Sequence, residues 1–107
     1  MELNDFQELC KRTAVYPPRN GITYCVMGLV SEAGEVAGKL KKYIRGDYGA
    51  PPDHMARISE ELGDVLWYAA MLSTEIGVQL NDVAEGVLTK LEKRMEAGTI
   101  KGSGDIR

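Results

Sequence analysis

Apolar residues recur along the chain at intervals of three and four positions, the period of an amphipathic helix, and no segment alternates apolar with polar residues as a strand would. The pattern predicts four helices, over residues 4–15, 21–45, 53–76 and 81–97. Tyr16-Pro17-Pro18 ends the first helix, and Gly46 and Gly77 end the second and third. Short connections between long helices favour an all-α fold, an antiparallel four-helix bundle.

The chain has the length of a single domain, with 107 residues. We assign residues 1–97 to the helical domain and 98–107 to a glycine-rich C-terminal tail. Hydrophobic residues make up 44% and charged residues 27%, as in an ordinary globular protein, and no apolar run approaches the ~20 residues of a membrane span. The acidic, amphipathic start MELNDFQELC does not resemble a signal peptide, so we expect a cytoplasmic protein.

Charge and cysteine usage exclude several function classes. A net charge of −3 and a pI near 5.1 give no general attraction to nucleic acids or acidic membranes, so we expect neither as a partner. Cys10 and Cys25 have no CxxC spacing and no companion histidines, which argues against a zinc site or a redox pair. We expect both cysteines to be small buried side chains.

Each of the two central helices carries a wide apolar stripe when its residues are plotted at about 100° per residue. The expected core positions are Ile22, Val26, Leu29, Val30, Ala33, Val36, Ala37, Leu40 and Ile44, and Met55, Ile58, Leu62, Val65, Leu66, Ala69, Leu72 and Ile76. Trp67 and Met71 lie nearly opposite the second stripe. Because a small monomer can hardly cover both faces, we expect the bundle to self-associate, with Trp67 and Met71 at the interface.

Two acidic pairs flank these stripes. Glu32 and Glu35 lie three residues apart on the second helix, and Glu61 and Asp64 repeat that spacing on the third. They could be solvated acids in local ion pairs, such as Glu35 with Lys39. If the pairs face each other, four carboxylates must either take up protons or bind a cation.

The ligand chemistry narrows the choice of metal. Carboxylate oxygens suit Mg²⁺, with Mn²⁺ as a second possibility, and do not suit zinc. A ferritin-type di-iron site needs a histidine three residues after a ligand glutamate. The single histidine, His54, precedes Glu61 by seven residues, so we expect it to be a surface or helix-start residue.

The segments SEAGE and ISEELGDVLWYAA, in this order, resemble the ExxE…ExxD signature of the MazG-like all-α nucleotide pyrophosphohydrolases. The similarity extends from the aromatic-proline loop before GLVSEAGE to KLEKR and the tail GTIKGSGDIR, which is typical of a short, single-domain subgroup. It implies an all-α NTP pyrophosphatase fold, assembled as a homodimer or homotetramer. The implied reaction is hydrolysis of a nucleoside triphosphate between the α and β phosphates, giving a monophosphate and pyrophosphate.

Carried over by motif position, the resemblance implies that Glu32, Glu35, Glu61 and Asp64 are the catalytic magnesium ligands. The chain departs from the family at two positions. Some members have a further acid where Ser31 stands, and many have an asparagine where Val87 falls. These departures leave the metal ligands intact and bear on contacts with the sugar or base.

Several residues are candidates for the chemistry or for substrate binding. Glu35 or Glu32 could accept a proton from the attacking water. Tyr68 could stack on the nucleotide base or simply pack, and Tyr24 is a weaker candidate for the same contact. The cations available to neutralise a pyrophosphate leaving group are Lys90, Lys93, Arg94, Lys101 and Arg107. The glycines of KGSGD follow a helix and open none, so the segment is not a P-loop; the resemblance favours a loop that closes over substrate.

Two other functions remain open on the sequence. One is a pyrophosphohydrolase for a special nucleotide, such as phosphoribosyl-ATP or a dUTP or dCTP type of substrate. The other is a non-catalytic helical oligomerisation module whose acids serve only solubility.

Overall fold

The computed structural model describes residues 1–47 and 53–101, and helices are its only regular elements within those ranges. The four α-helices are α1 (Leu3–Cys10), α2 (Gly21–Arg45), α3 (Asp53–Glu75) and α4 (Leu80–Glu96). Two short 3-10 helices, η1 (Lys11–Thr13) and η2 (Pro18–Asn20), connect α1 to α2. The predicted all-α fold with four helices is confirmed, and α1 is shorter than expected because the chain tightens into η1 after Cys10.

Glycines end the two central helices where the sequence indicated. Gly46 follows α2 with φ 90, and its N–H donates to the carbonyl of Tyr43. Gly77 follows α3 with φ 79. A left-handed backbone is strained for residues with a Cβ atom, so glycine makes both stops inexpensive.

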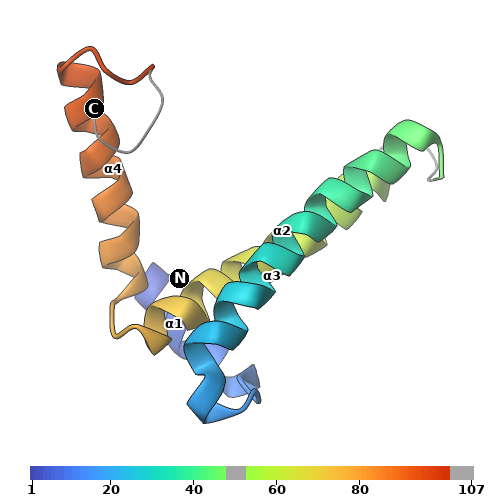
Figure 1. The fold of residues 1–107 in the computed structure, drawn as a ribbon, viewed down its shortest axis with the longest axis horizontal. Coiled ribbons are helices and arrows are strands. Elements are labelled where there is room, and N and C mark those ends of the chain that lie inside the picture. The colour runs from blue at the N-terminus through green and yellow to red at the C-terminus, as the bar shows by residue number, and fades with distance from the viewer. Residues whose placement is uncertain (48–52, 102–107) are drawn as a thin grey trace.

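Helices α2 and α3 run antiparallel, side by side, and form one arm of a V; α4 forms the other arm, and α1 lies where the arms meet (Figure 1). The buried core sits at this vertex, where Cys10, Cys25, Ala70, Met71 and Leu80 pack together. The two cysteines are free thiols within it, as expected. None of the described helices is long and apolar enough to cross a membrane.

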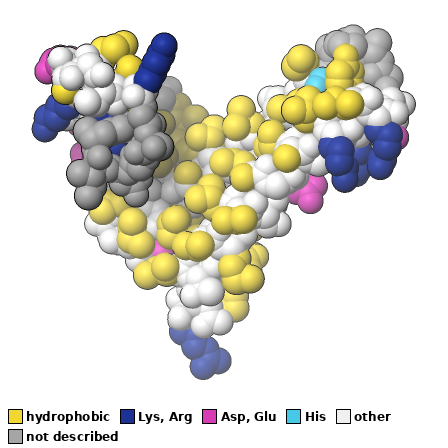
Figure 2. Space-filling view, turned by 45° about the horizontal axis from the view of Figure 1, so that its top comes forward, with side chains coloured by type: hydrophobic (Ala, Val, Ile, Leu, Met, Phe, Trp, Pro, Cys, Tyr) yellow, Lys and Arg dark blue, Asp and Glu magenta, His cyan; other side chains and the backbone are white. Residues whose placement is uncertain are grey.

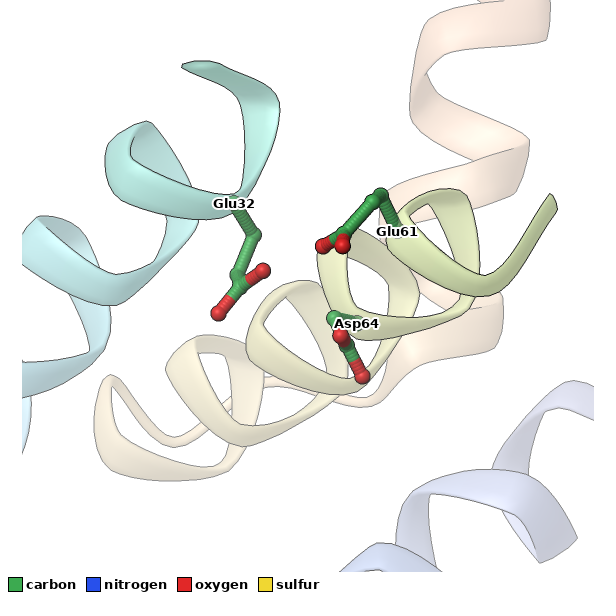
Figure 3. Close-up of side chains that lie close together, drawn as sticks. All are labelled: Glu32, Glu61 and Asp64. Carbon is green, nitrogen blue, oxygen red and sulfur yellow. The ribbon is translucent and has the colours of Figure 1, made fainter. Parts of the chain in front are cut away.

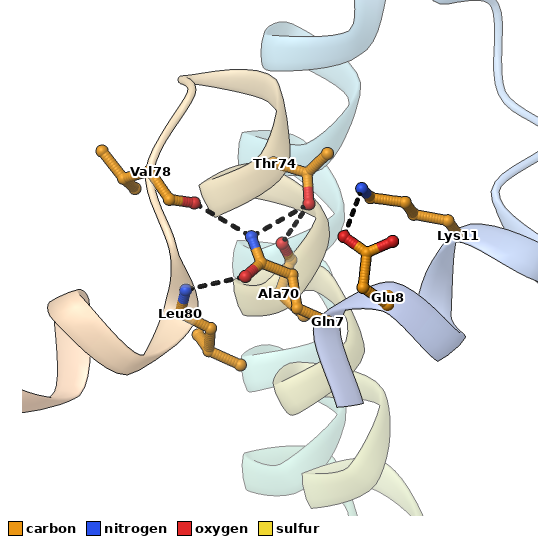
Figure 4. A network of polar contacts seen from close by, with 7 residues as sticks. All are labelled: Gln7, Glu8, Lys11, Ala70, Thr74, Val78 and Leu80. Carbon is orange, nitrogen blue, oxygen red and sulfur yellow. Dashed lines mark hydrogen bonds and ion pairs between the residues drawn. The ribbon is translucent and has the colours of Figure 1, made fainter. Parts of the chain in front are cut away.

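The side chain of Gln7 joins α1 to the start of α4 (Figure 4). Its amide nitrogen donates to Thr74 Oγ1 and to the carbonyl of Val78, and its amide oxygen accepts from the N–H of Leu80. Asn4 accepts in the same way from the N–H of Asn81. Because a helix leaves its first N–H groups without intrahelical partners, α1 supplies the cap that α4 lacks in its own sequence.

The apolar stripes of the α2–α3 arm are largely exposed in the single chain, as the hydrophobic surface of that arm in Figure 2 shows. Ile44 is 76% exposed and Val30 68%. Met71, expected at an interface, is instead a core residue at 3%, and Trp67 packs against that core. Both faces of α3 carry apolar residues at helical spacing. This spacing does not indicate which of the two faces is buried within the single chain.

His54 is a second difference from the sequence expectation. It lies at the start of α3, as predicted, but it is only 3% exposed and its ring stacks on Tyr43 with centroids 3.9 Å apart. Its Nδ1 has no hydrogen-bond partner among the described residues. The stack comes from the antiparallel pairing of α2 with α3, which a single-helix pattern does not reveal.

Candidate metal centre

Three carboxylates from the two central helices converge halfway along the α2–α3 arm. Glu32 projects from α2 towards Glu61 and Asp64 on α3 (Figure 3). One oxygen of each lies within 4.8 Å of the others, and the group combines two half-buried acids with the exposed Asp64. The structure therefore brings together three of the four acids that the sequence singled out, and we call them the acidic cluster.

The close approach of the helices here depends on Gly28. A Cβ atom at this position would lie 2.1 Å from the ring of Tyr68, one helical turn after Asp64. Without a side chain at Gly28 the ring of Tyr68 lies directly on the backbone of α2. Glu32, one turn further along α2, is thereby brought opposite Asp64.

The negative charges of the cluster repel one another. The pKa of Glu32 is raised above the ordinary glutamate value, first because burial disfavours its charged form and then because of a hydrogen bond with Glu61 and the charges of its acidic neighbours. A divalent cation would relieve this repulsion, and oxygen-only ligands match magnesium or manganese. The residues present therefore fit such an ion.

Glu35 lies outside the acidic cluster. It is exposed on the next turn of α2, near enough for its charge to contribute to the raised pKa of Glu32. Its role as a fourth metal ligand stays a prediction.

Lys39 is the residue near the cluster that the sequence analysis did not select. Its spacing suggested a local ion pair with Glu35, but its Nζ lies 3.7 Å from Oε1 of Glu61 on the other helix. Both side chains are largely buried, at 21% and 16% exposed. This partner can be identified only when the packing of α2 against α3 is known.

A cavity of about 400 Å³ opens beside the cluster, with Glu32 and Asp64 in its wall. Its other lining residues are Thr13, Val15, Tyr16, Tyr24, Trp67 and Tyr68. Tyr68 and Tyr24, the two tyrosines predicted as base contacts, both line this cavity, as do Tyr16 and Trp67; a contact with substrate stays a prediction. Trp67, expected at a subunit interface, instead lines this cavity.

The aromatic side chains hold one another in place. Tyr16 stacks on Tyr24 with ring centroids 5.0 Å apart, and Trp67 meets Tyr68 edge to face at 4.9 Å. Trp67 Nε1 also donates to Thr13 Oγ1 at 2.8 Å, which ties the indole to η1. Flat, rigid walls of this kind can receive a planar aromatic ligand.

Of the predicted cations, those that the structure describes are not gathered at the acidic cluster within one chain. Lys90 and Arg94 lie on α4, the other arm of the V, and Lys101 follows that helix (Figure 1). Arg107 and the tail from residue 102 onward lie outside the described residues. A role for these four cations in substrate binding therefore stays a prediction.

Comparison with known proteins supplies the class. The chain belongs to the MazG nucleotide pyrophosphohydrolase domain family, whose model matches residues 22–99 and so includes all three cluster residues. It is 40% identical to the Gene 37 protein of Mycobacterium phage L5, over the whole length of both chains. The crystal structure of iMazG from Vibrio DAT 722 is similar at a TM-score of 0.62 and 28% identity, covering 90% of this chain and 97% of that one.

Proposed function

We propose that the protein hydrolyses nucleoside triphosphates, ribo or deoxy, between the α and β phosphates in the presence of Mg²⁺, and releases a nucleoside monophosphate and pyrophosphate. Membership of a nucleotide pyrophosphohydrolase family supports the reaction class. The observation that carries the proposal is that the acidic cluster borders an aromatic cavity. Glu32 and Asp64 belong to the cluster and also form part of the cavity wall. Such a site can hold a base and a polyphosphate side by side.

The chain's own residues divide the work. Glu32, Glu61 and Asp64, with Glu35 beside them, would hold Mg²⁺, or Mn²⁺ in its place. When bound, such an ion neutralises phosphate oxygens and lowers the pKa of a bound water. Glu35 or Glu32 takes the proton of the attacking water.

The aromatic cavity would bind the nucleotide base. Tyr68 is our first candidate for stacking, because its ring lies between the cavity and the backbone of Gly28, one turn from Asp64. Lys90, Arg94, Lys101 and Arg107 remain candidates to neutralise the polyphosphate. Within one chain Lys90 and Arg94 belong to the opposite arm, so they would reach substrate through a second subunit.

The exposed apolar stripes of α2 and α3 support such a second copy. A homodimer or homotetramer would cover side chains such as Ile44 and Val30, which water surrounds in the single chain.

The test is the product of the reaction. The protein is incubated with each NTP and dNTP plus Mg²⁺, and products are separated by anion-exchange chromatography. Pyrophosphate and the monophosphate should form in equal amounts, and Glu61→Gln should abolish both while retaining the helical circular dichroism spectrum. Release of orthophosphate, or no turnover of any nucleotide in the panel, would contradict the proposal.

The same panel, extended to phosphoribosyl-ATP, separates a general enzyme from one for a special nucleotide. A ligand that binds only the folded state raises the melting temperature of a protein. A protein that binds Mg²⁺ should therefore melt at a higher temperature when the ion is added. A non-catalytic module without a metal site would show no such rise and no turnover.

A further inference from the structure

The side chains along the α2–α3 contact follow an order that neither helix shows alone. On α2, Tyr24, Glu32 and Lys39 follow one another at intervals of eight and seven residues on one flank. At 1.5 Å per residue, Lys39 lies about 10 Å beyond Glu32 along the helix axis. The aromatic cavity is therefore at one end, the acidic cluster in the middle, and an ammonium group at the other end.

The contacts on α3 confirm this order. The ring of Tyr68 lies over Gly28, Asp64 lines the cavity with Glu32, and Glu61 meets Lys39. Because α3 runs antiparallel to α2 (Figure 1), Tyr68 lies at the cavity and Glu61, earlier on α3, lies at Lys39. The acidic cluster thus has different neighbours along the two directions of the arm.

Lys39 keeps its donors available. Its Nζ lies 3.7 Å from Oε1 of Glu61, beyond the usual hydrogen-bond length of about 2.7–3.2 Å. Among the described residues, the contact of Lys39 is thus an ion pair longer than a hydrogen bond, and its ammonium can turn towards a bound anion.

We propose that Lys39 binds the β and γ phosphates of the substrate and holds the pyrophosphate that leaves. This inference rests on the proposed function and assigns a direction to it. With the base in the aromatic cavity and the α phosphorus at the acidic cluster, the two outer phosphates extend towards Lys39. These phosphates carry most of the negative charge, and Lys39 is the described cation that an ion pair places beside the acidic cluster within one chain.

In the hydrolysis reaction Lys39 serves as a binding group for the leaving pyrophosphate. The water oxygen bonds to the α phosphorus, one of its two protons goes to Glu35 or Glu32, and the other stays with the monophosphate. The bond from the α phosphorus to the bridging oxygen breaks, and its electron pair leaves with the pyrophosphate. The ammonium of Lys39 offsets the negative charge that this departure adds.

The alternative is that Lys39 only balances Glu61. In that case its removal would alter the cluster but would not distinguish pyrophosphate from the monophosphate. The two products therefore separate a role in binding the leaving group from a purely structural one.

The experiment is isothermal titration calorimetry in Mg²⁺ with inorganic pyrophosphate, and separately with each of AMP, GMP, CMP and UMP. The proteins are the wild type, Lys39→Met, Lys39→Arg and the control Lys41→Met, which removes an exposed lysine from the same helix. Loss of a charge-assisted contact predicts pyrophosphate binding about 10- to 100-fold weaker in Lys39→Met. Monophosphate binding should stay within about twofold, Lys39→Arg should retain pyrophosphate, and Lys41→Met should match the wild type.

Equal weakening of both products, or unchanged pyrophosphate binding in Lys39→Met, would overturn the assignment, as would a wild type that binds no pyrophosphate. The pyrophosphate titration needs no turnover. A wild type that hydrolyses no nucleotide would refute the proposed function, and the binding data would still decide the role of Lys39.

Discussion

Glu61 is the residue at which the parts of the site meet. It lies within the acidic cluster, forms a hydrogen bond with Glu32 that helps raise that group's pKa, and pairs with Lys39. The sequence could identify Glu61 because the i, i+3 spacing with Asp64 repeats the Glu32 and Glu35 pair. It could not identify Lys39, because local spacing offers Glu35 as a partner and the actual contact joins two helices.

Glu32 makes the stability of the metal-free protein depend on pH. Its raised pKa means that the folded state keeps a proton which the unfolded state, near pKa 4.3, has already lost. The stabilising contribution is full below that pH and disappears as pH rises through the folded-state pKa. Urea unfolding in EDTA should show wild type losing stability relative to Glu32→Gln as pH rises from 4 to 7, and parallel curves would contradict this.

Gly28 should tolerate no side chain. A Cβ atom there would lie 2.1 Å from Tyr68, so the ring would have to leave its place in the cavity wall. We expect Gly28→Ala to lower the free energy of unfolding by about 1–3 kcal/mol and to weaken nucleotide binding. Chemical denaturation and calorimetry measure the two effects.

Gly34→Ala on the same helix is the matched control, because a Cβ atom there meets nothing within 4 Å. Alanine favours a helix over glycine by about 1 kcal/mol, so this variant should be as stable as wild type or more so. Equal effects of the two substitutions would show that helix propensity, and not the contact with Tyr68, decides the result.

At the scale of elements, the sequence predicted the helices well because their ends carry explicit signals. Gly46 and Gly77 stop α2 and α3, and Pro17 and Pro18 separate α1 from α2. It did not show how α4 is fixed to α1. Gln7 is a polar residue of α1, and its three partners come from α3, the turn after α3 and the first residue of α4.

Gln7→Ala should therefore loosen α4. It leaves the N–H of Leu80 without its partner at a buried position and removes the part-buried bonds to Val78 and Thr74, at a cost of about 2–3 kcal/mol. Hydrogen exchange at Leu80 should accelerate with the fall in stability. Glu8→Ala, which removes an exposed ion pair with Lys11, should change the free energy of unfolding by less than about 1 kcal/mol, and a similar loss in both variants would contradict this account.

At the scale of the whole molecule, the sequence correctly indicated that the chain carries more apolar surface than it can bury. It placed Met71 at an interface and Leu62 in the core, whereas Met71 is in the core and Leu62 is 52% exposed; Leu72 of the expected stripe does pack against the core. The periodicity of a sequence shows that a helix is amphipathic. Which face of α3 is buried within the chain depends on where α1 packs.

The exposed stripe gives a prediction for assembly. If a second copy covers it, Val30→Glu should place a charge in an apolar interface and convert the wild-type oligomer to monomers. Sedimentation velocity measures the change, and Ser59→Glu, at an exposed polar position of α3, is the control. A monomeric wild type, or an unchanged oligomer in Val30→Glu, would exclude this face as the interface.

The central claim is that Glu32, Glu61 and Asp64 bind a divalent ion together. Electron paramagnetic resonance of Mn²⁺ titrated into the nucleotide-free protein measures this most directly, since free and bound Mn²⁺ give different signals. We predict saturable binding to the wild type and its loss in Glu61→Gln and Asp64→Asn, with Mg²⁺ competing for the same site. Equal Mn²⁺ binding by the wild type and both variants, or none by the wild type, would contradict the account.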